Sequence, residues 1–218
     1  ACAPYRRLNL CNKNLKNINN IDSDKARHNL LVDVCMAANY EAQSLIRDHP
    51  QYKLTYDDSK ICTVLARSFA DIGDIVRGRD LYSGNTKEKE KRKQLDDKLK
   101  KIFGDIYNDL TSGRNGKKLA LQKRYQDEIG GNFFKLREDW WTENRETVWK
   151  AMTCSDDLKD ASYFRATCGG DRQGPSQTHN KCRCGDGKKP RKGSGDVNIV
   201  PTYFDYVPQF LRWFEEWA

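Results

Sequence analysis

Zinc binding is the first chemistry that the side chains suggest. Thiolate and imidazole groups are the usual zinc ligands, and the last third of the chain offers four of them in Cys168, His179, Cys182 and Cys184. One residue separates Cys182 from Cys184, whereas zinc-binding pairs are usually separated by roughly two to four residues. The spacing therefore favours disulfides over a metal site, and we expect neither a metal nor another cofactor.

The sequence supports a catalytic site even less than it supports a zinc site. The histidines are His28, His49 and His179, and none lies in a nucleophile motif. No glycine loop of the phosphate-binding or dinucleotide-binding type is present. Three acidic pairs are adjacent in sequence, so their carboxylates point in different directions and are poorly placed for acid–base work: Asp57–Asp58, Asp96–Asp97 and Asp156–Asp157. The sequence predicts a protein that is not an enzyme.

The eight cysteines fall into two groups of four. Paired thiols in this number are typical of oxidising compartments, so we expect an extracellular protein with all eight in disulfides. The even number in each group indicates bridges within the groups, with Cys35–Cys62 as one reasonable pair, although sequence does not settle the pairing. Eight reduced cysteines in a cytosolic protein are the alternative. The groups are Cys2, Cys11, Cys35 and Cys62, and then Cys154, Cys168, Cys182 and Cys184.

Basic residues gather along the chain and could bind a polyanion. The 39 Lys and Arg outnumber 31 Asp and Glu, which gives a formal net charge of +8. Such positive fields attract polyanions with an affinity that falls as salt rises. Because disulfides place the protein outside the cell, we expect a sulfated glycan of the heparan type rather than nucleic acid. The candidate glycan-binding residues are Lys87, Lys89, Lys91, Arg92, Lys93, Lys117, Lys118, Lys188, Lys189, Arg191 and Lys192.

Other interpretations of the charges and aromatic rings remain open. Interleaved Glu and Lys between residues 87 and 101 also fit a solvated helix face. Aromatic and basic residues together could stack single-stranded nucleic acid, but the tryptophans have the spacing of a helical core. A zinc-stabilised intracellular nucleic-acid binder, an apolar protein–protein interface and a scaffold without a receptor site are therefore the rival hypotheses.

The elements that position these residues are predicted to be helices, because apolar residues recur at three- and four-residue steps. The expected fold class is all-α, with an irregular loop at 154–200 held by cysteines. Trp140, Trp141, Trp149 and the stripe Phe210–Trp217 are expected in the core. The predicted helices cover 25–49 with Pro50 as the stop, the stretch between Ser59 as cap and Gly78, 87–110, 119–128, 132–152 and a last helix with Pro208 in its first turn.

No apolar stretch approaches the roughly 18 to 20 residues that span a bilayer, so we expect no membrane insertion within this chain. Both ends look like cuts within a longer protein. With 37% hydrophobic and 32% charged residues, the core is expected to be thin and to depend on large aromatic side chains.

Four blocks of the sequence resemble a known family. They are Cys2-Ala-Pro-Tyr-Arg-Arg-Leu8, Asp71–Tyr82, Arg137–Lys150 and Val200–Trp217. Together they resemble the Duffy-binding-like alpha domain of Plasmodium falciparum erythrocyte membrane protein 1. The resemblance implies a helical fold in three subdomains, with residues 1–110 as the later part of the first, 111–218 as the second, and the third absent.

The resemblance also implies a function. It indicates a variant surface antigen on the extracellular face of the infected red cell, which binds red-cell receptors in rosetting and is bound by host antibodies. The receptors that it implies are heparan sulfate, blood-group sugars and complement receptor. Specificity is expected in two exposed loops, 83–93 and 169–198. The long blocks are expected to be scaffold, and Asp71 and Asp74 have no evident chemistry of their own.

Overall fold

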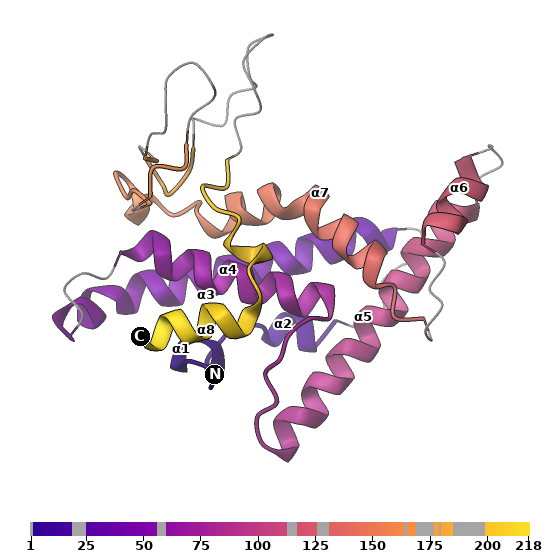
Figure 1. Ribbon diagram of the computed structural model, residues 1–218, viewed down its shortest axis with the longest axis horizontal. Helices are drawn as coiled ribbons and strands as arrows, with labels where there is room; N and C mark the ends of the chain where they lie inside the picture. Colours follow the sequence, from indigo (N-terminus) through magenta and orange to yellow (C-terminus); the bar gives the residue numbers. More distant parts are fainter. Residues whose placement is uncertain are drawn as a thin grey trace, which may run out of the picture.

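A computed structural model describes residues 2–18, 25–55, 60–112, 117–125, 131–163, 165–168, 177–178, 180–184 and 199–218. Within these ranges the regular elements are helices, apart from an isolated antiparallel bridge between Asn180 and Arg183. The all-α prediction is confirmed. The helices are α1 (Tyr5–Leu8), α2 (Lys13–Lys16), α3 (Ala26–Thr55), α4 (Ile61–Arg77), α5 (Thr86–Ser112), α6 (Lys117–Arg124), α7 (Phe134–Met152), η2 (Asp156–Leu158), η3 (Phe204–Tyr206) and α8 (Gln209–Trp217) (Figure 1).

Helix α4 lies at the centre of the molecule. It packs against α3, α7, α8 and η3, while α5 crosses the assembly obliquely and carries α6 at its far end (Figure 1). Phe69 of α4 stacks against two tryptophans of α7, with ring centroids 5.0 Å from Trp141 and 5.1 Å from Trp149. Phe103 of α5 meets the ring of Trp140 edge-on at 6.1 Å. The three α7 tryptophans are buried, as their spacing predicted.

The ends of the first two long helices follow sequence rules only in part. Gly78 has the left-handed φ of 74° and ends α4, as predicted, because glycine adopts this conformation without strain. The N-cap of α4 is Lys60, so the prediction of Ser59, which lies outside the described residues, is wrong. Pro50 does not stop α3, which continues to Thr55. Pro50 is exposed, so water can reach the carbonyl that loses its helical donor.

The expectation of an exposed loop over 83–93 is also corrected. Helix α5 begins at Thr86, so the lysine-rich stretch is the first half of a helix, as the apolar period of 87–110 predicted. Asn85 precedes this helix, and its side-chain oxygen accepts a hydrogen bond of 3.0 Å from the backbone N–H of Glu88. This bond satisfies a helix-start donor that would otherwise have no partner.

Helix α8 turns its apolar stripe outward, against expectation. Trp213 is buried, but Phe210, Leu211, Phe214 and Trp217 are between 47% and 68% exposed. Gln209 and Arg212 are buried on the face of α8 that meets α4. The prediction of a helix was right, but the prediction of its buried face was wrong. Arg212 pairs with Asp71 and Asp74 of α4, so the polar face of α8 packs against α4.

Two disulfides link described cysteines; one agrees with the predicted pairing within groups, and the other overturns it. Cys62 of α4 pairs with Cys182 across the two groups, and Cys168 pairs with Cys184. Cys2, Cys11, Cys35 and Cys154 are thiols, so neither the Cys35–Cys62 bridge nor complete pairing is present. The cross-group bridge forms because Cys182 packs beside α7, where its carbonyl accepts a 3.1 Å hydrogen bond from Nε1 of Trp149.

Replacing Gly73 by alanine is expected to lower the free energy of unfolding by about 1 to 2 kcal/mol. A Cβ at this position in α4 would lie 2.7 Å from Cζ2 of Trp141. The indole is buried and held by a 2.9 Å hydrogen bond from its Nε1 to Asp205, so it has no room to shift. Overpacking costs about 1 to 3 kcal/mol and exceeds the roughly 1 kcal/mol that alanine contributes to a helix. Urea unfolding measures the change.

Gly104 in α5 is the matched control. A Cβ there would meet Phe133 at an ordinary 3.6 Å. Gly104→Ala should therefore raise the free energy of unfolding, by at most about 1 kcal/mol. Shifts of the same sign in both variants would contradict the packing account.

Candidate functional site

A basic pocket of about 310 Å³ lies beside the first half of α5. The α1–α2 segment forms one wall, the turn after α4 forms the floor, and α5 closes the other side. Its lining contains five basic and three acidic residues, which leaves two excess positive charges. The lining is Arg7, Leu8, Leu10, Asn12, Lys16, Ile75, Gly78, Asp80, Tyr82, Glu88, Lys89, Arg92, Lys93, Leu95, Asp96 and Leu99.

The floor of the pocket is a buried ion pair between Arg7 and Asp80. Arg7 donates to both carboxylate oxygens, from Nη2 to Oδ2 at 2.5 Å and from Nε to Oδ1 at 3.2 Å. The Arg7 guanidinium also lies over the Tyr82 ring, 4.7 Å from its centroid. Arg92 of α5 donates to the backbone carbonyls of Asp80 and Tyr82. Both arginines are thus held rigidly by the turn at 80–82.

Lys16 is the partly buried lysine of the pocket, and its side chain is 31% exposed. Its Nζ lies 3.9 Å from Oε2 of Glu88, at the limit of an ion pair. Burial lowers the pKa of Lys16, the positive charges of Lys91, Arg7 and Lys13 lower it further, and Glu88 opposes them. The lowered pKa therefore reflects mainly the loss of hydration around the ammonium, which Glu88 offsets only in part.

Exposed lysines stand on the same half of α5. We call Lys87, Lys89, Lys91 and Lys93 the α5 lysines; all four are exposed, and Lys89 and Lys93 line the pocket. Lys91 pairs with Glu88 at 3.4 Å, whereas no described residue forms an ion pair with the other three. Their charges are therefore available to an external anion.

The structure brings together only part of the predicted glycan-binding set. Lys89, Arg92 and Lys93 meet at the pocket. Helix α6, which begins with Lys117 and Lys118, lies at the opposite end of α5, and those two side chains lie outside the described residues (Figure 1). So do the basic loop residues Lys188, Lys189, Arg191 and Lys192.

Sequence reasoning missed the pocket residues that come from outside α5. Arg7 and Lys16 lie in or near short helices that no periodic pattern predicted, and Asp80 and Tyr82 follow α4. Arg7, Asp80 and Tyr82 all fall within the blocks that carry the family resemblance, which is the signal that could have found them. Lys16 lies outside those blocks.

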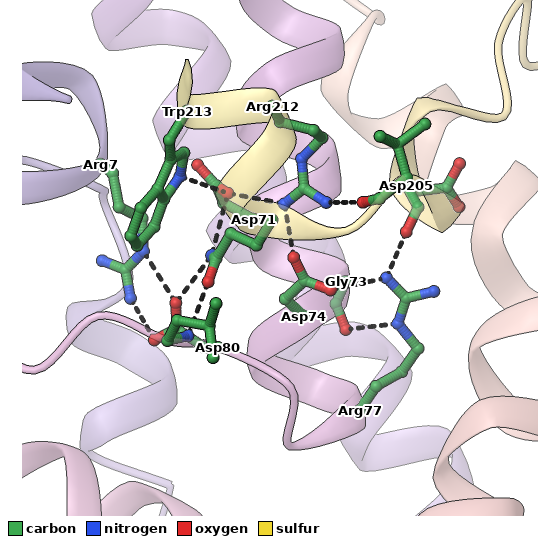
Figure 2. A network of polar contacts seen from close by, with 12 residues as sticks. Arg7, Asp71, Gly73, Asp74, Arg77, Asp80, Asp205, Arg212 and Trp213 are labelled. Atoms are coloured by element: carbon green, nitrogen blue, oxygen red, sulfur yellow. Dashed lines mark hydrogen bonds and ion pairs between the residues drawn. The ribbon is translucent and has the colours of Figure 1, made fainter. Parts of the chain in front are cut away.

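A network of buried ion pairs and hydrogen bonds adjoins the Arg7–Asp80 ion pair at the floor of the pocket (Figure 2). Asp71 of α4 lies 2.8 Å from Nη2 of Arg6 and 2.9 Å from Nη2 of Arg212. The side-chain amide of Gln209 donates to Asp71 at 3.1 Å and to Asp80 at 2.8 Å, and so links the network to the pocket. Burial alone would raise the pKa of Asp71, but Arg6 and Arg212 lower it below its ordinary value.

The pKa values of the neighbouring acids Asp71 and Asp74 shift in opposite directions. Burial raises the pKa of Asp74, even though Arg212 and Arg77 counteract it. Asp205 of η3 accepts from Nε1 of Trp141 at 2.9 Å and pairs with Arg145 at 2.7 Å.

The ion pairs with Arg6 and Arg212 join α1 and α8 to α4. They give a structural role to Asp71 and Asp74, which had no evident chemistry in the sequence.

Other kinds of site receive no support from the part of the chain that is described. Three candidate zinc ligands, Cys168, Cys182 and Cys184, are in disulfides, and His179 lies outside the described residues. Over the described ranges, no group of three or more His, Cys, Asp or Glu residues is placed to hold a metal ion. None of the helices described there combines the length and apolarity needed to cross a membrane.

Comparisons with known proteins agree with the fold. The family model of the Duffy binding domain matches residues 1–212. The NTS-DBL1(alpha-1) domain of Plasmodium falciparum membrane protein 1 (PfEMP1), varO strain, is 42% identical with a TM-score of 0.70, and the match covers 100% of this chain and 43% of that one. The ICAM-1-binding PfEMP1 IT4var13 DBLbeta domain is 31% identical with a TM-score of 0.64, over 97% of this chain and 41% of that one.

This chain thus spans less than half of the length of those solved chains. No curated protein matches it. Because the matching family is one of binding domains, the prediction that the chain is not an enzyme is confirmed. The chain belongs to the Duffy binding domain family and is similar over its whole length to Duffy-binding-like domains of Plasmodium falciparum PfEMP1.

Proposed function

We propose that this chain is part of an adhesion domain of a variant surface antigen, displayed on the extracellular face of the infected red cell. In this role it binds host red-cell receptors in rosetting, chiefly sulfated glycans of the heparan type. Family membership supports an adhesion role. A related domain, IT4var13 DBLbeta, has been solved bound to ICAM-1. Blood-group sugars and complement receptor are further candidate partners, and host antibodies would recognise the same exposed surface.

One observation carries the glycan proposal: exposed lysines, three of them without an ion pair to any described residue, cluster beside a pocket with excess positive charge. A sulfated chain can lie along α5 and replace the counterions of the α5 lysines. Each exposed contact contributes only a few tenths to about 1 kcal/mol, so affinity arises from several contacts together. The proposal includes the division into subdomains that the family resemblance implies, with residues 1–110 in the first and residues 111–218 in the second.

Replacing all four α5 lysines by glutamine is expected to weaken binding to immobilised heparin by about tenfold or more at physiological salt. The side chains are exposed, so the free energy of unfolding should change little. Surface plasmon resonance measures the affinity, and urea unfolding verifies the fold.

The control removes the same number of charges elsewhere. Lys101, Lys135, Lys150 and Lys159 are exposed and do not line the pocket. Their fourfold replacement by glutamine should weaken binding by no more than about threefold. Equal losses in the two variants would show that net charge, and not the α5 surface, governs binding.

A second candidate is adhesion to a host protein through the outward face of α8. Phe210, Leu211, Phe214 and Trp217 expose apolar side chains there. Exposed apolar patches of this kind mark protein contacts. Such binding would change little with salt, whereas glycan binding through the α5 lysines weakens steeply as salt rises.

A further inference from the structure

The pocket beside α5 contains one partly buried lysine, Lys16, whose charge is weakly paired. Arg7 is fully engaged with Asp80, and Arg92 with the carbonyls of Asp80 and Tyr82. Among the described residues, the ion partner of Lys16 is the distant Glu88 carboxylate at 3.9 Å. The Lys16 side chain is only 31% exposed, so its ammonium is less hydrated than those of the exposed Lys89 and Lys93. An anion that enters the pocket would therefore find its strongest unmet attraction at Lys16.

Glu88 can leave Lys16 without becoming an isolated charge. Its other carboxylate oxygen lies 3.4 Å from Nζ of Lys91, three residues later on the same helix. If an external anion takes Lys16, Glu88 retains Lys91 and access to solvent, since its side chain is 32% exposed. Binding of the anion would thus replace the long Lys16–Glu88 ion pair by a closer one between Lys16 and the anion. It would leave no buried charge without a partner.

The walls of the pocket suit a small ligand of about one sugar unit and not a long polysaccharide chain. Leucines at positions 8, 10, 95 and 99 line it, together with the ring of Tyr82. A volume of about 310 Å³ is at the lower end of small-molecule sites, which run from roughly 300 to 1,000 Å³. Together with the charged groups of the lining, these side chains offer both apolar and polar contacts to one sugar-sized unit.

We propose that the pocket is a subsite for a single sulfate or phosphate monoester on a sugar-sized body, whose anionic group takes Lys16 from Glu88 while Lys89 and Lys93 close the mouth. The inference rests on the proposed glycan-binding function and narrows it, because it separates one discrete subsite from the general attraction of the α5 lysines. No covalent step is involved.

The test uses small probes on the 218-residue chain: galactose 6-sulfate, galactose 6-phosphate, galactose and inorganic sulfate, each titrated and followed by NMR chemical shifts. We expect saturable binding of the two esters at millimolar concentration and none of galactose. The tighter ester identifies whether sulfate or phosphate is the intended group. Binding of inorganic sulfate as tight as that of the esters would overturn the sugar-sized subsite.

Four variants locate the site. Lys16→Gln should weaken ester binding by about tenfold, because it removes a charged hydrogen bond, whereas Lys16→Arg should stay within about threefold. Glu88→Gln should tighten binding by about threefold, because it removes the competing carboxylate. A purely structural role for Glu88 would give no tightening. Lys13→Gln, on the same short helix but outside the pocket lining, is the matched control and should have little effect.

The outcomes separate this inference from the function on which it rests. If heparin binding depends on the α5 lysines but no ester binds, the subsite is wrong and the adhesion proposal stands. If Lys16→Gln and Lys13→Gln behave alike, or if Glu88→Gln weakens ester binding, the subsite is likewise wrong.

Discussion

Removing the Cys62–Cys182 disulfide by replacing both cysteines with alanine is expected to lower the free energy of unfolding by about 5 kcal/mol. The bridge joins residues 120 positions apart, so its loss releases a very long loop in the unfolded chain. Both cysteines are buried, and the double replacement avoids leaving one buried thiol alone. Urea unfolding, with the slope checked for two-state behaviour, measures the loss.

The shorter bridge provides the comparison. Cys168 and Cys184 are separated by only 16 positions, so their joint replacement by alanine should cost about 3 kcal/mol. The order of the two losses is the decisive result. A smaller loss for the long bridge than for the short one would contradict the assignment of Cys62–Cys182 as the main covalent link between α4 and the cysteine-rich segment.

Replacing Asp71 by asparagine is expected to cost about 3 to 5 kcal/mol of stability. The carboxylate is the shared partner of Arg6 of α1 and Arg212 of α8, whose side chains are buried. Removing one partner of a buried ion network leaves uncompensated charge behind, which is what makes the change costly. Asp97→Asn on the exposed face of α5 is the control and should stay within about 0.5 kcal/mol.

Acid titration of stability tests the same carboxylate. The folded-state pKa of Asp71 is below its ordinary value of 3.8. Its stabilising contribution is therefore present above that value and is lost as pH falls through the lowered pKa. Asp71→Asn should remove this part of the acid dependence. A loss below about 1 kcal/mol at neutral pH, with an unchanged acid limb, would contradict the network.

The effect of Asp71 should extend to the pocket. Gln209 contacts both Asp71 and Asp80, so disturbing one acid shifts the amide that also steadies the other. Asp80 in turn holds Arg7 at the pocket floor. The network thus couples the packing of α8 on α4 to the shape of the anion site.

Local pattern was enough to predict the long helices and much of the core. The apolar period placed the α7 tryptophans inside, and Gly78 marked the end of α4, because both features depend on nearby residues. The outward face of α8 was not predictable in this way. Its orientation depends on Arg212 reaching Asp71 and Asp74, which lie far away in sequence.

In the candidate site, too, residues close in sequence were predictable and residues brought together by packing were not. Lys89, Arg92 and Lys93 were evident from charge density on one stretch of chain. Lys16 joins them only because α2 packs against α5, a contact that no local signal encodes. The cross-group disulfide escaped prediction for the same reason, since even numbers in each cysteine group say nothing about which helix lies beside which loop.

Affinity for heparin as a function of salt concentration is the most direct test of the central claim. If the α5 lysines and the basic pocket bind sulfated glycans, the logarithm of the association constant should fall linearly with the logarithm of salt concentration. The fourfold lysine-to-glutamine variant should show a shallower slope, and desulfated heparin should not bind. Binding that is independent of salt, or equally strong for desulfated heparin, would contradict the claim.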